Sequence, residues 1–321
     1  MFNLLKHPRP LDPASVQFLQ RVAQANRPSM ADMTPENARV SYEALNALFD
    51  FAPEQVQSTR NLSIPVSGGK ISARLYEGDG VAADLQTTPL LIFAHGGGFV
   101  VGGLEGYDSL CRMLANAIQC KVLALDYRMA PEHRFPTAAD DVYAAWHWAY
   151  AHADALGVNA QRIAGIGDSA GGNLTAQATA RLRAEGLPVA GQVLVYPAVS
   201  EKNDTASDKA YASGYLIDRR TMDWFMDNYI DPSAAPVDER LNLRTAENLG
   251  HAIPTYFQLA ECDPLVDEAM LFANALHDAG SDVKMDVYSG MLHGFYHMPK
   301  LFTQAVDARR DTVAWLKSVF A

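Results

Sequence analysis

The chain has 321 residues, 49% hydrophobic and 20% charged, which is the composition of an ordinary globular protein. Its formal net charge of −11 opposes binding to nucleic acids and to anionic membrane surfaces. The cysteines, Cys111, Cys120 and Cys262, are too scattered for a disulfide framework or a metal site, so we expect buried thiols in a reducing compartment and no bound metal.

The first 55 residues predict two amphipathic helices. Asp12-Pro13 and Thr34-Pro35 each place an N-cap residue before a proline at the first helical position. The buried side of the first helix is expected to contain Val16, Leu19, Val22 and Ala23. Since these helices precede the first strand, they are expected outside the sheet, either as a lid or as a docking arm.

From residue 56 to residue 199, strands alternate with helices. Alternating apolar residues predict a hairpin over 61–76, and continuous apolar runs predict buried strands at 90–94, 121–125, 162–164 and 192–197. Residues 200–248 are polar and aromatic and predict a helical insertion. Residues 249–321 resume the alternation with strands at 254–260 and 283–288. The pattern predicts an α/β fold with a mostly parallel sheet of about eight strands and right-handed crossovers.

The segment Gly167-Asp168-Ser169-Ala170-Gly171 lies between a predicted strand and a predicted helix. This is the pattern of a nucleophile elbow, a sharp turn that needs residues without bulk around its serine. The helix that follows directs its positive N-terminal end toward the Ser169 hydroxyl. A glycine-rich turn with an ordinary serine would look the same, so the interpretation depends on a base, an acid and oxyanion donors elsewhere.

The oxyanion donors are expected in the stretch 95–98, His-Gly-Gly-Gly, which directly follows a buried strand. Three glycines let backbone N–H groups approach a ligand without side chains between. The stretch does not fit a dinucleotide-binding loop, because the third glycine of that motif is missing. We assign the N–H groups of Gly97 and Gly98 to the oxyanion hole, together with that of Ala170, and expect His95 to be structural.

The acid and the base are expected on loops after the last two strands, because the carboxyl ends of parallel strands meet at one edge of the sheet. Asp263 lies in the first loop, whereas Asp267 and Glu268 fall in the first helical turn, where carboxylates interact with the helix dipole. His293 follows the final strand, with His297 as the alternative base. The order Ser169, Asp263, His293 is that of the α/β-hydrolases.

Other polar residues are interpreted as structural. Asp168 is expected to form local hydrogen bonds, and His277 to be solvated on a helix surface. The stretches 126–128 and 132–134 are expected to form an ion-pair network that braces a loop. Asp140-Asp141 is expected to cap the next helix.

These motifs together resemble the bacterial hormone-sensitive-lipase-like (family IV) esterases of the α/β-hydrolase fold. The resemblance rests on the glycine stretch 95–98, on 126–136 (Asp-Tyr-Arg-Met-Ala-Pro-Glu-His-Arg-Phe-Pro), on 167–172, on 263–265 (Asp-Pro-Leu) and on 293–295 (His-Gly-Phe). It covers the chain from about residue 60 to the C-terminus. Met129 and Arg134 differ from the residues usual in the family, but neither touches the expected chemistry.

The resemblance implies a triad of Ser169, Asp263 and His293 that hydrolyses short- to medium-chain acyl esters without a cofactor. It implies a helical cap from 1–55 and 200–248, which leaves 56–199 and 249–321 as the two parts of the catalytic core. Dimers through the last strand occur in the family, so a homodimer is a further expectation. Separately, the aromatic residues Phe99, Tyr211 and Trp224 are expected to line the acyl pocket.

Three other functions use the same fold. A lipase would need a broad exposed apolar rim to bind an oil surface. An amidase shares the acyl chemistry and differs in protonation of the leaving group. A non-catalytic binding protein, as in the related gibberellin receptors, would lack the catalytic histidine, whereas the motif around His293 is intact. With no secretory signal and no apolar run of membrane-spanning length, the expected location is the cytoplasm.

Overall fold

The computed structural model describes the chain except residues 82–83, 232, 234–238 and 246–252. In the described residues, eight strands form one sheet in the order β1-β2-β4-β3-β5-β6-β7-β8. A hairpin of β1 (Ser58–Val66) and β2 (Gly69–Glu77) lies antiparallel to β4, and the other strands pair in parallel. These parallel strands are β3 (Leu90–Ala94), β4 (Lys121–Asp126), β5 (Ile163–Asp168), β6 (Gly191–Val195), β7 (Thr255–Cys262) and β8 (Val283–Leu292). The predicted mostly parallel sheet is confirmed.

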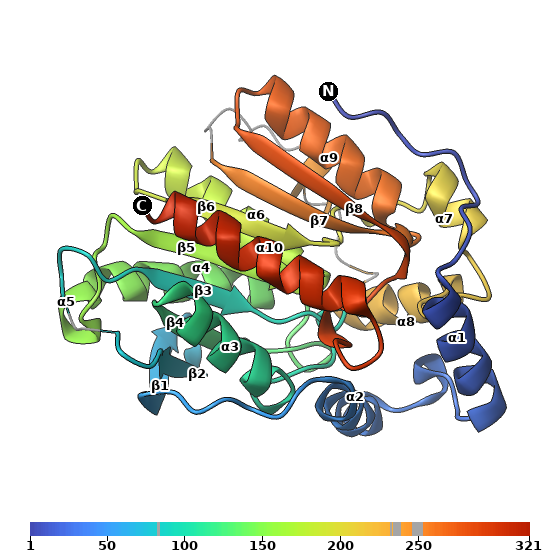
Figure 1. The fold of residues 1–321 in the computed structure, drawn as a ribbon, viewed down its shortest axis with the longest axis horizontal. Coiled ribbons are helices and arrows are strands. Elements are labelled where there is room, and N and C mark those ends of the chain that lie inside the picture. Colours follow the sequence, from blue (N-terminus) through green and yellow to red (C-terminus); the bar gives the residue numbers. More distant parts are fainter. Residues whose placement is uncertain (82–83, 232, 234–238, 246–252) are drawn as a thin grey trace.

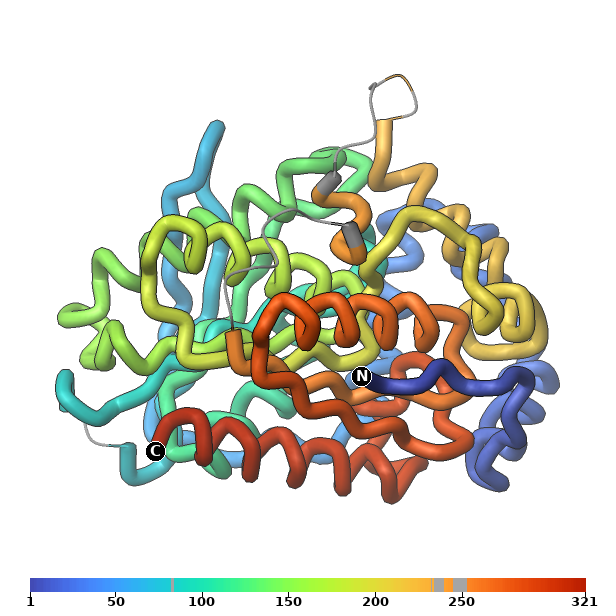
Figure 2. Tube along the Cα trace, turned by 90° about the horizontal axis from the view of Figure 1, so that it is seen from above, coloured from blue at the N-terminus to red at the C-terminus, as the bar shows by residue number. Residues whose placement is uncertain are grey.

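Helices cover both faces of the sheet (Figure 1 and Figure 2). One face carries α3 (Asp108–Ile118) and α10 (Thr303–Val319), and their apolar side chains form one core with the strands. The other face carries α4 (Thr137–Ala151), α5 (Ala153–Leu156), α6 (Ala170–Ala184) and α9 (Val266–Asp278) over two further clusters. Residues of β3, β5, β6 and β7 are buried throughout, because helices cover both of their faces.

The N-terminal segment forms α1 (Pro13–Ala25), η1 (Met30–Asp32) and α2 (Pro35–Phe49). The predicted caps are confirmed, since the side chains of Asp12 and Thr34 accept hydrogen bonds from the first turn of each helix. The predicted buried side of α1 is largely wrong, because Val16, Val22 and Ala23 are exposed. Phe18 is buried instead, with its ring edge-on to Phe49 and Phe302. Distant aromatic partners, rather than the apolar stripe, therefore determine which side of α1 is covered.

The insertion after β6 contains α7 (Ala206–Ala210), α8 (Arg219–Tyr229), η3 (Glu239–Leu241) and η4 (Leu243–Thr245). The parts of 200–248 at 232, 234–238 and 246–248 lie outside the described residues. Figure 1 shows α1, α2, α7 and α8 gathered at one side of the molecule, beyond an end of the sheet. Two short helices, η2 (Glu105–Tyr107) and η6 (Phe295–His297), precede α3 and α10. In the described part of the chain, no helix is both long and apolar enough to cross a bilayer.

Candidate active site

Ser169 occupies the turn between β5 and α6 with φ +52° and ψ −119°, a backbone conformation that residues with a side chain rarely adopt. The chain around it is crowded. A Cβ at Gly171 would lie 2.0 Å from the carbonyl oxygen of Ala94, and one at Gly167 would lie 2.2 Å from the carbonyl oxygen of Gly171. Glycine is therefore required on both sides of the serine, as expected for a nucleophile elbow.

The side chains of Ser169, His293 and Asp263 form one line of contacts. His293 Nε2 lies 3.0 Å from Ser169 Oγ, and His293 Nδ1 lies 2.7 Å from Asp263 Oδ2. Asp263 is fully buried just after β7, and its other oxygen accepts the N–H of Leu265 at 2.9 Å. His293 is 9% exposed just after β8. An imidazole between a hydroxyl and a buried carboxylate is the arrangement that can take a proton from the hydroxyl and return it.

The loop after β3 offers backbone donors beside Ser169. The N–H groups of Val100 and Val101 both donate to the Gly97 carbonyl, which closes a tight turn over the glycines. Among the described residues, no protein acceptor takes the N–H group of Gly97, Gly98 or Ala170. These three N–H groups are therefore available to bind an oxygen that carries negative charge.

Asp168 joins two of these loops. Its buried carboxylate accepts the Gly96 N–H at 2.8 Å, and its other oxygen lies 2.9 Å from His297 Nε2. Burial alone would raise the pKa of Asp168, but His297 and the Gly96 N–H hold that pKa below its usual range. His297, the alternative base, thus pairs with Asp168 and not with Ser169. Asp168 therefore accepts hydrogen bonds, but the prediction that these are local is wrong, because Gly96 and His297 both lie far from it in the sequence and no local pattern reveals them.

His95 is buried and makes structural contacts, as expected. Its ring stacks on Tyr127 with centroids 4.3 Å apart, and its Nδ1 lies 2.8 Å from the Gly96 carbonyl oxygen. The Tyr127 hydroxyl donates to the His95 carbonyl at 2.7 Å. These contacts hold the start of the glycine loop against the end of β4. His277, the expected surface histidine, is exposed on α9.

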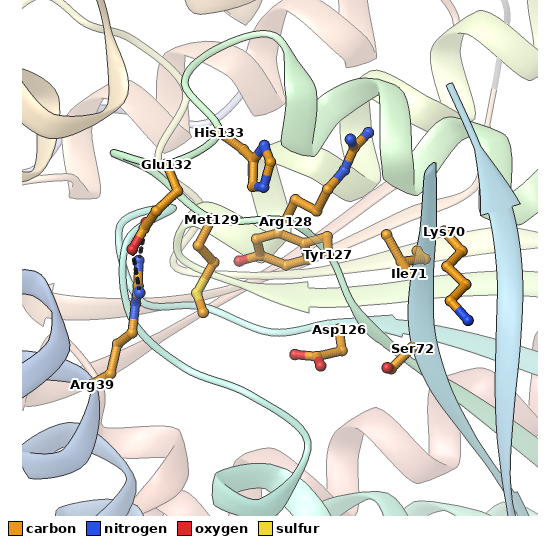
Figure 3. A pocket seen from close by; sticks show the side chains of 10 residues that line it. All are labelled: Arg39, Lys70, Ile71, Ser72, Asp126, Tyr127, Arg128, Met129, Glu132 and His133. Carbon is orange, nitrogen blue, oxygen red and sulfur yellow. Dashed lines mark hydrogen bonds and ion pairs between the residues drawn. The ribbon is translucent and has the colours of Figure 1, made fainter. Parts of the chain in front are cut away.

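The polar stretches after β4 pair with distant parts of the chain. Both stretches contribute ion pairs, as expected, but the partners lie outside 126–134: Arg128 pairs with Asp141 at 2.6 Å, and Glu132 pairs with Arg39 of α2 at 2.6 Å. Asp141 therefore binds Arg128 instead of capping α4, which already begins at Thr137. Arg39, Arg128 and Glu132 help to line an open cavity of about 360 Å³ (Figure 3) that contains none of the triad candidates.

A smaller cavity of about 70 Å³ reaches Ser169 and His293. Phe99 lines it, as expected, but Tyr211 and Trp224 are not among its lining residues. Tyr211 is fully buried with its hydroxyl 3.0 Å from His7 Nδ1, and Trp224 packs edge-on to Phe225. On α8 the positions 222, 225 and 226 share one side at helical spacing, so Met222, Phe225 and Met226 face the cavity.

Comparison with known proteins agrees with this geometry. A model of the alpha/beta hydrolase fold matches residues 91–297, more than half of the chain. This chain belongs to the α/β-hydrolase family. It is similar to an ethyl acetate hydrolase of Pseudomonas putida, 34% identical over 92% of this chain and 95% of that protein. It is also similar to the carboxylic ester hydrolase LipN of Mycobacterium tuberculosis, 41% identical over 80% of this chain and 69% of LipN.

Solved structures give the same result. An ester hydrolase from the metagenome of Lake Arreo superposes with a TM-score of 0.91 and 33% identity, covering 97% of this chain and 99% of the other. The thermostable carboxylesterase EstE1 from a metagenomic library gives a TM-score of 0.86 and 36% identity, covering 92% of this chain and all of EstE1. This α/β-hydrolase is therefore a carboxylic ester hydrolase of the hormone-sensitive-lipase-like group.

Proposed function

We propose that this α/β-hydrolase is a serine carboxylesterase in which Ser169 is the nucleophile, His293 the general base and Asp263 the residue that orients His293. The unbroken contact from Ser169 Oγ through His293 to the buried Asp263 carboxylate carries the proposal. The Gly97, Gly98 and Ala170 N–H groups would form the oxyanion hole. This role is supported because no acceptor among the described residues takes these three N–H groups.

The mechanism has two halves. Ser169 attacks the ester carbonyl while His293 takes its proton, and the three N–H groups hold the oxyanion of the tetrahedral intermediate. His293 then protonates the leaving alcohol, which leaves an acyl-enzyme on Ser169. Water repeats the same steps and releases the acid. Asp263 keeps the imidazole in the required tautomer throughout, and no step calls for a cofactor.

The substrates we propose are small esters with short to medium acyl chains. The small cavity at Ser169 and its apolar wall support this choice over the bulky substrates of a lipase. The similarity to an ethyl acetate hydrolase also supports small ester substrates. Comparing matched ester and amide substrates of one acyl group separates this activity from that of an amidase on the same triad.

We also propose that residues 1–55 and 200–248 act together as the cap. The ion pair between Arg220 of α8 and Asp32 of η1 joins the two segments and supports this grouping. We propose a cytoplasmic location, which three free cysteines fit, and a homodimer through β8, the outermost strand of the sheet. Light scattering of the purified protein tests the dimer.

Replacing the nucleophile tests the proposal. Ser169→Ala removes the attacking oxygen, so turnover of p-nitrophenyl butyrate should fall by roughly a million-fold while the fold is unchanged. A fluorophosphonate should label the unaltered protein at Ser169 and leave Ser169→Ala unlabelled. Hydrolysis by Ser169→Ala at the parent rate would refute the assignment and would leave a binding protein or another nucleophile.

A further inference from the structure

The cavity at Ser169 contains one acidic side chain among its described lining residues, that of Glu201. Most of the wall that the cap contributes is apolar, formed by Ile217, Met222, Phe225 and Met226. The net charge of −11 does not explain an acid at this position, because charge for solubility belongs on the outer surface. Glu201 therefore requires an explanation of its own.

The Glu201 carboxylate has no partner among the described residues. Its Oε2 is shielded from solvent and accepts no hydrogen bond, and the side chain forms no ion pair. The neighbouring cations are engaged elsewhere or point outward, since Arg244 pairs with Asp204 at 3.0 Å and Lys202 is exposed. A shielded carboxylate oxygen without a donor costs free energy, and a ligand that brings a positive charge would recover that cost.

The backbone holds Glu201 in a fixed position. Its N–H donates to the Leu241 carbonyl at 3.1 Å, and the preceding Ser200 forms an antiparallel bridge with Asn242. One residue further back, the Val199 N–H donates to the buried Glu268 carboxylate at 2.8 Å. Glu201 thus lines the cavity from a stretch that is braced on both sides, which limits how far the residue can move.

We infer that Glu201 is a specificity-determining residue that selects esters carrying a quaternary or protonated amine near the scissile bond. The inference rests on the proposed esterase function of Ser169. The amine could belong to the alcohol part or to the acyl part of the substrate, since either could lie along this wall. The acidic surface of the whole protein would add a long-range attraction for such cations.

Matched pairs of esters test the inference on the intact protein. For the alcohol part, choline acetate is compared with its carbon isostere, 3,3-dimethylbutyl acetate. For the acyl part, the p-nitrophenyl ester of 4-(trimethylammonio)butanoate is compared with that of 5,5-dimethylhexanoate. In each pair, the ratio of kcat/KM for the cationic ester to that for the neutral ester is measured in the unaltered protein and in Glu201→Gln.

In at least one of the two ester pairs, Glu201→Gln should lower this ratio by about tenfold or more. The kcat/KM of Glu201→Gln for the neutral ester should stay within about twofold of the value for the unaltered protein. Asp223→Asn is the matched control, because it removes the same charge from an exposed position on α8 that does not line the cavity. In Asp223→Asn, the ratio of kcat/KM for the cationic ester to that for the neutral ester should equal the ratio in the unaltered protein.

Unchanged ratios in both pairs would overturn the inference, as would an equal effect of Asp223→Asn or a comparable loss on the neutral esters. Failure of the esterase proposal itself is distinguished by Ser169→Ala, which would then retain activity on the neutral esters.

Discussion

At the scale of single residues, Asp168 is notable because a buried charge lies next to the proposed nucleophile without facing the cavity. It holds the Gly96 N–H on one side and His297 on the other. The Asp168 carboxylate therefore connects the elbow to two other segments, the glycine loop and the loop that carries His293. We regard Asp168 as a positioning residue, which acts on the reaction through the loop that presents Gly97 and Gly98.

Asp168→Asn tests this role. The amide can still accept the Gly96 N–H but loses the charge that pairs with His297, so the glycine loop should be held less firmly. We expect kcat to fall by about ten- to a hundred-fold with little change in KM, because misplaced oxyanion donors affect the transition state more than substrate binding. Steady-state kinetics measure both constants.

His297→Gln serves as the partner variant and should reproduce the direction of the effect. If Asp168→Asn raised KM alone, or left kcat at the parent value with native circular dichroism, the positioning role would be wrong.

The residues around Ser169 show what sequence can reveal at this scale. The sequence brings Ser169, Asp263 and His293 together as one proposed triad, because each lies in a short motif directly after a predicted strand. The Asp168–His297 pair could not be predicted from the sequence, because two polar residues that are 129 positions apart leave no periodic signal. Tyr211 was misplaced for a related reason: its hydroxyl binds His7 from the N-terminal arm, a partner that only the fold brings near.

At the scale of elements, α8 determines the shape of the cavity. The ring of Phe225 packs so closely on the glycine loop that a Cβ at Gly98 would lie 2.2 Å from it. The sequence indicated an aromatic helix in the insertion, but it could not show which ring faces inward, because Trp224 and Phe225 are neighbours and α8 has apolar residues on more than one side.

Replacing Phe225 should change chain-length preference. Phe225→Ala removes a ring from the cavity wall, so kcat/KM for p-nitrophenyl octanoate relative to the butyrate should rise by about three- to tenfold. Trp224→Ala is the control, since its ring lies outside the cavity. An unchanged ratio in Phe225→Ala, or an equal rise in Trp224→Ala, would mean that α8 does not limit the acyl chain.

At the scale of the whole molecule, the sheet and the order of its elements follow from the alternation of apolar strands and helices, and these were predictable. The path of the first twelve residues could not be predicted from the sequence. This arm crosses to α9 and β7, where His7 pairs with Asp267 at 2.9 Å and Arg9 pairs with Glu261 at 2.8 Å. Asp267 and Glu268 lie in the first turn of α9, as expected, and they also tie α9 to other parts of the chain.

Glu268 links the core to the start of the insertion and makes stability depend on pH. Burial raises the pKa of Glu268 from its ordinary 4.5 to about 8, although the Val199 N–H and Arg244 oppose the rise. Between these values the folded protein keeps a proton that the unfolded chain has lost. The stability that this proton contributes is complete below about pH 4.5 and is lost as the pH rises toward 8.

Glu268→Gln removes this titration while keeping an oxygen that can accept the Val199 N–H. The other titrating groups are common to both proteins, so the difference in melting temperature reports on Glu268 alone. The melting temperature of Glu268→Gln minus that of the parent should therefore be smallest near pH 5 and should increase as the pH rises to 9. Glu132→Gln is a control of opposite sign: Arg39 lowers the pKa of Glu132 to about 2, so the difference between this variant and the parent should be constant from pH 5 to 9. Parallel melting profiles for Glu268→Gln and the parent would show that Glu268 ionises in the folded protein as it does in the unfolded chain, and that the link between α9 and Val199 is a charged one at every pH tested.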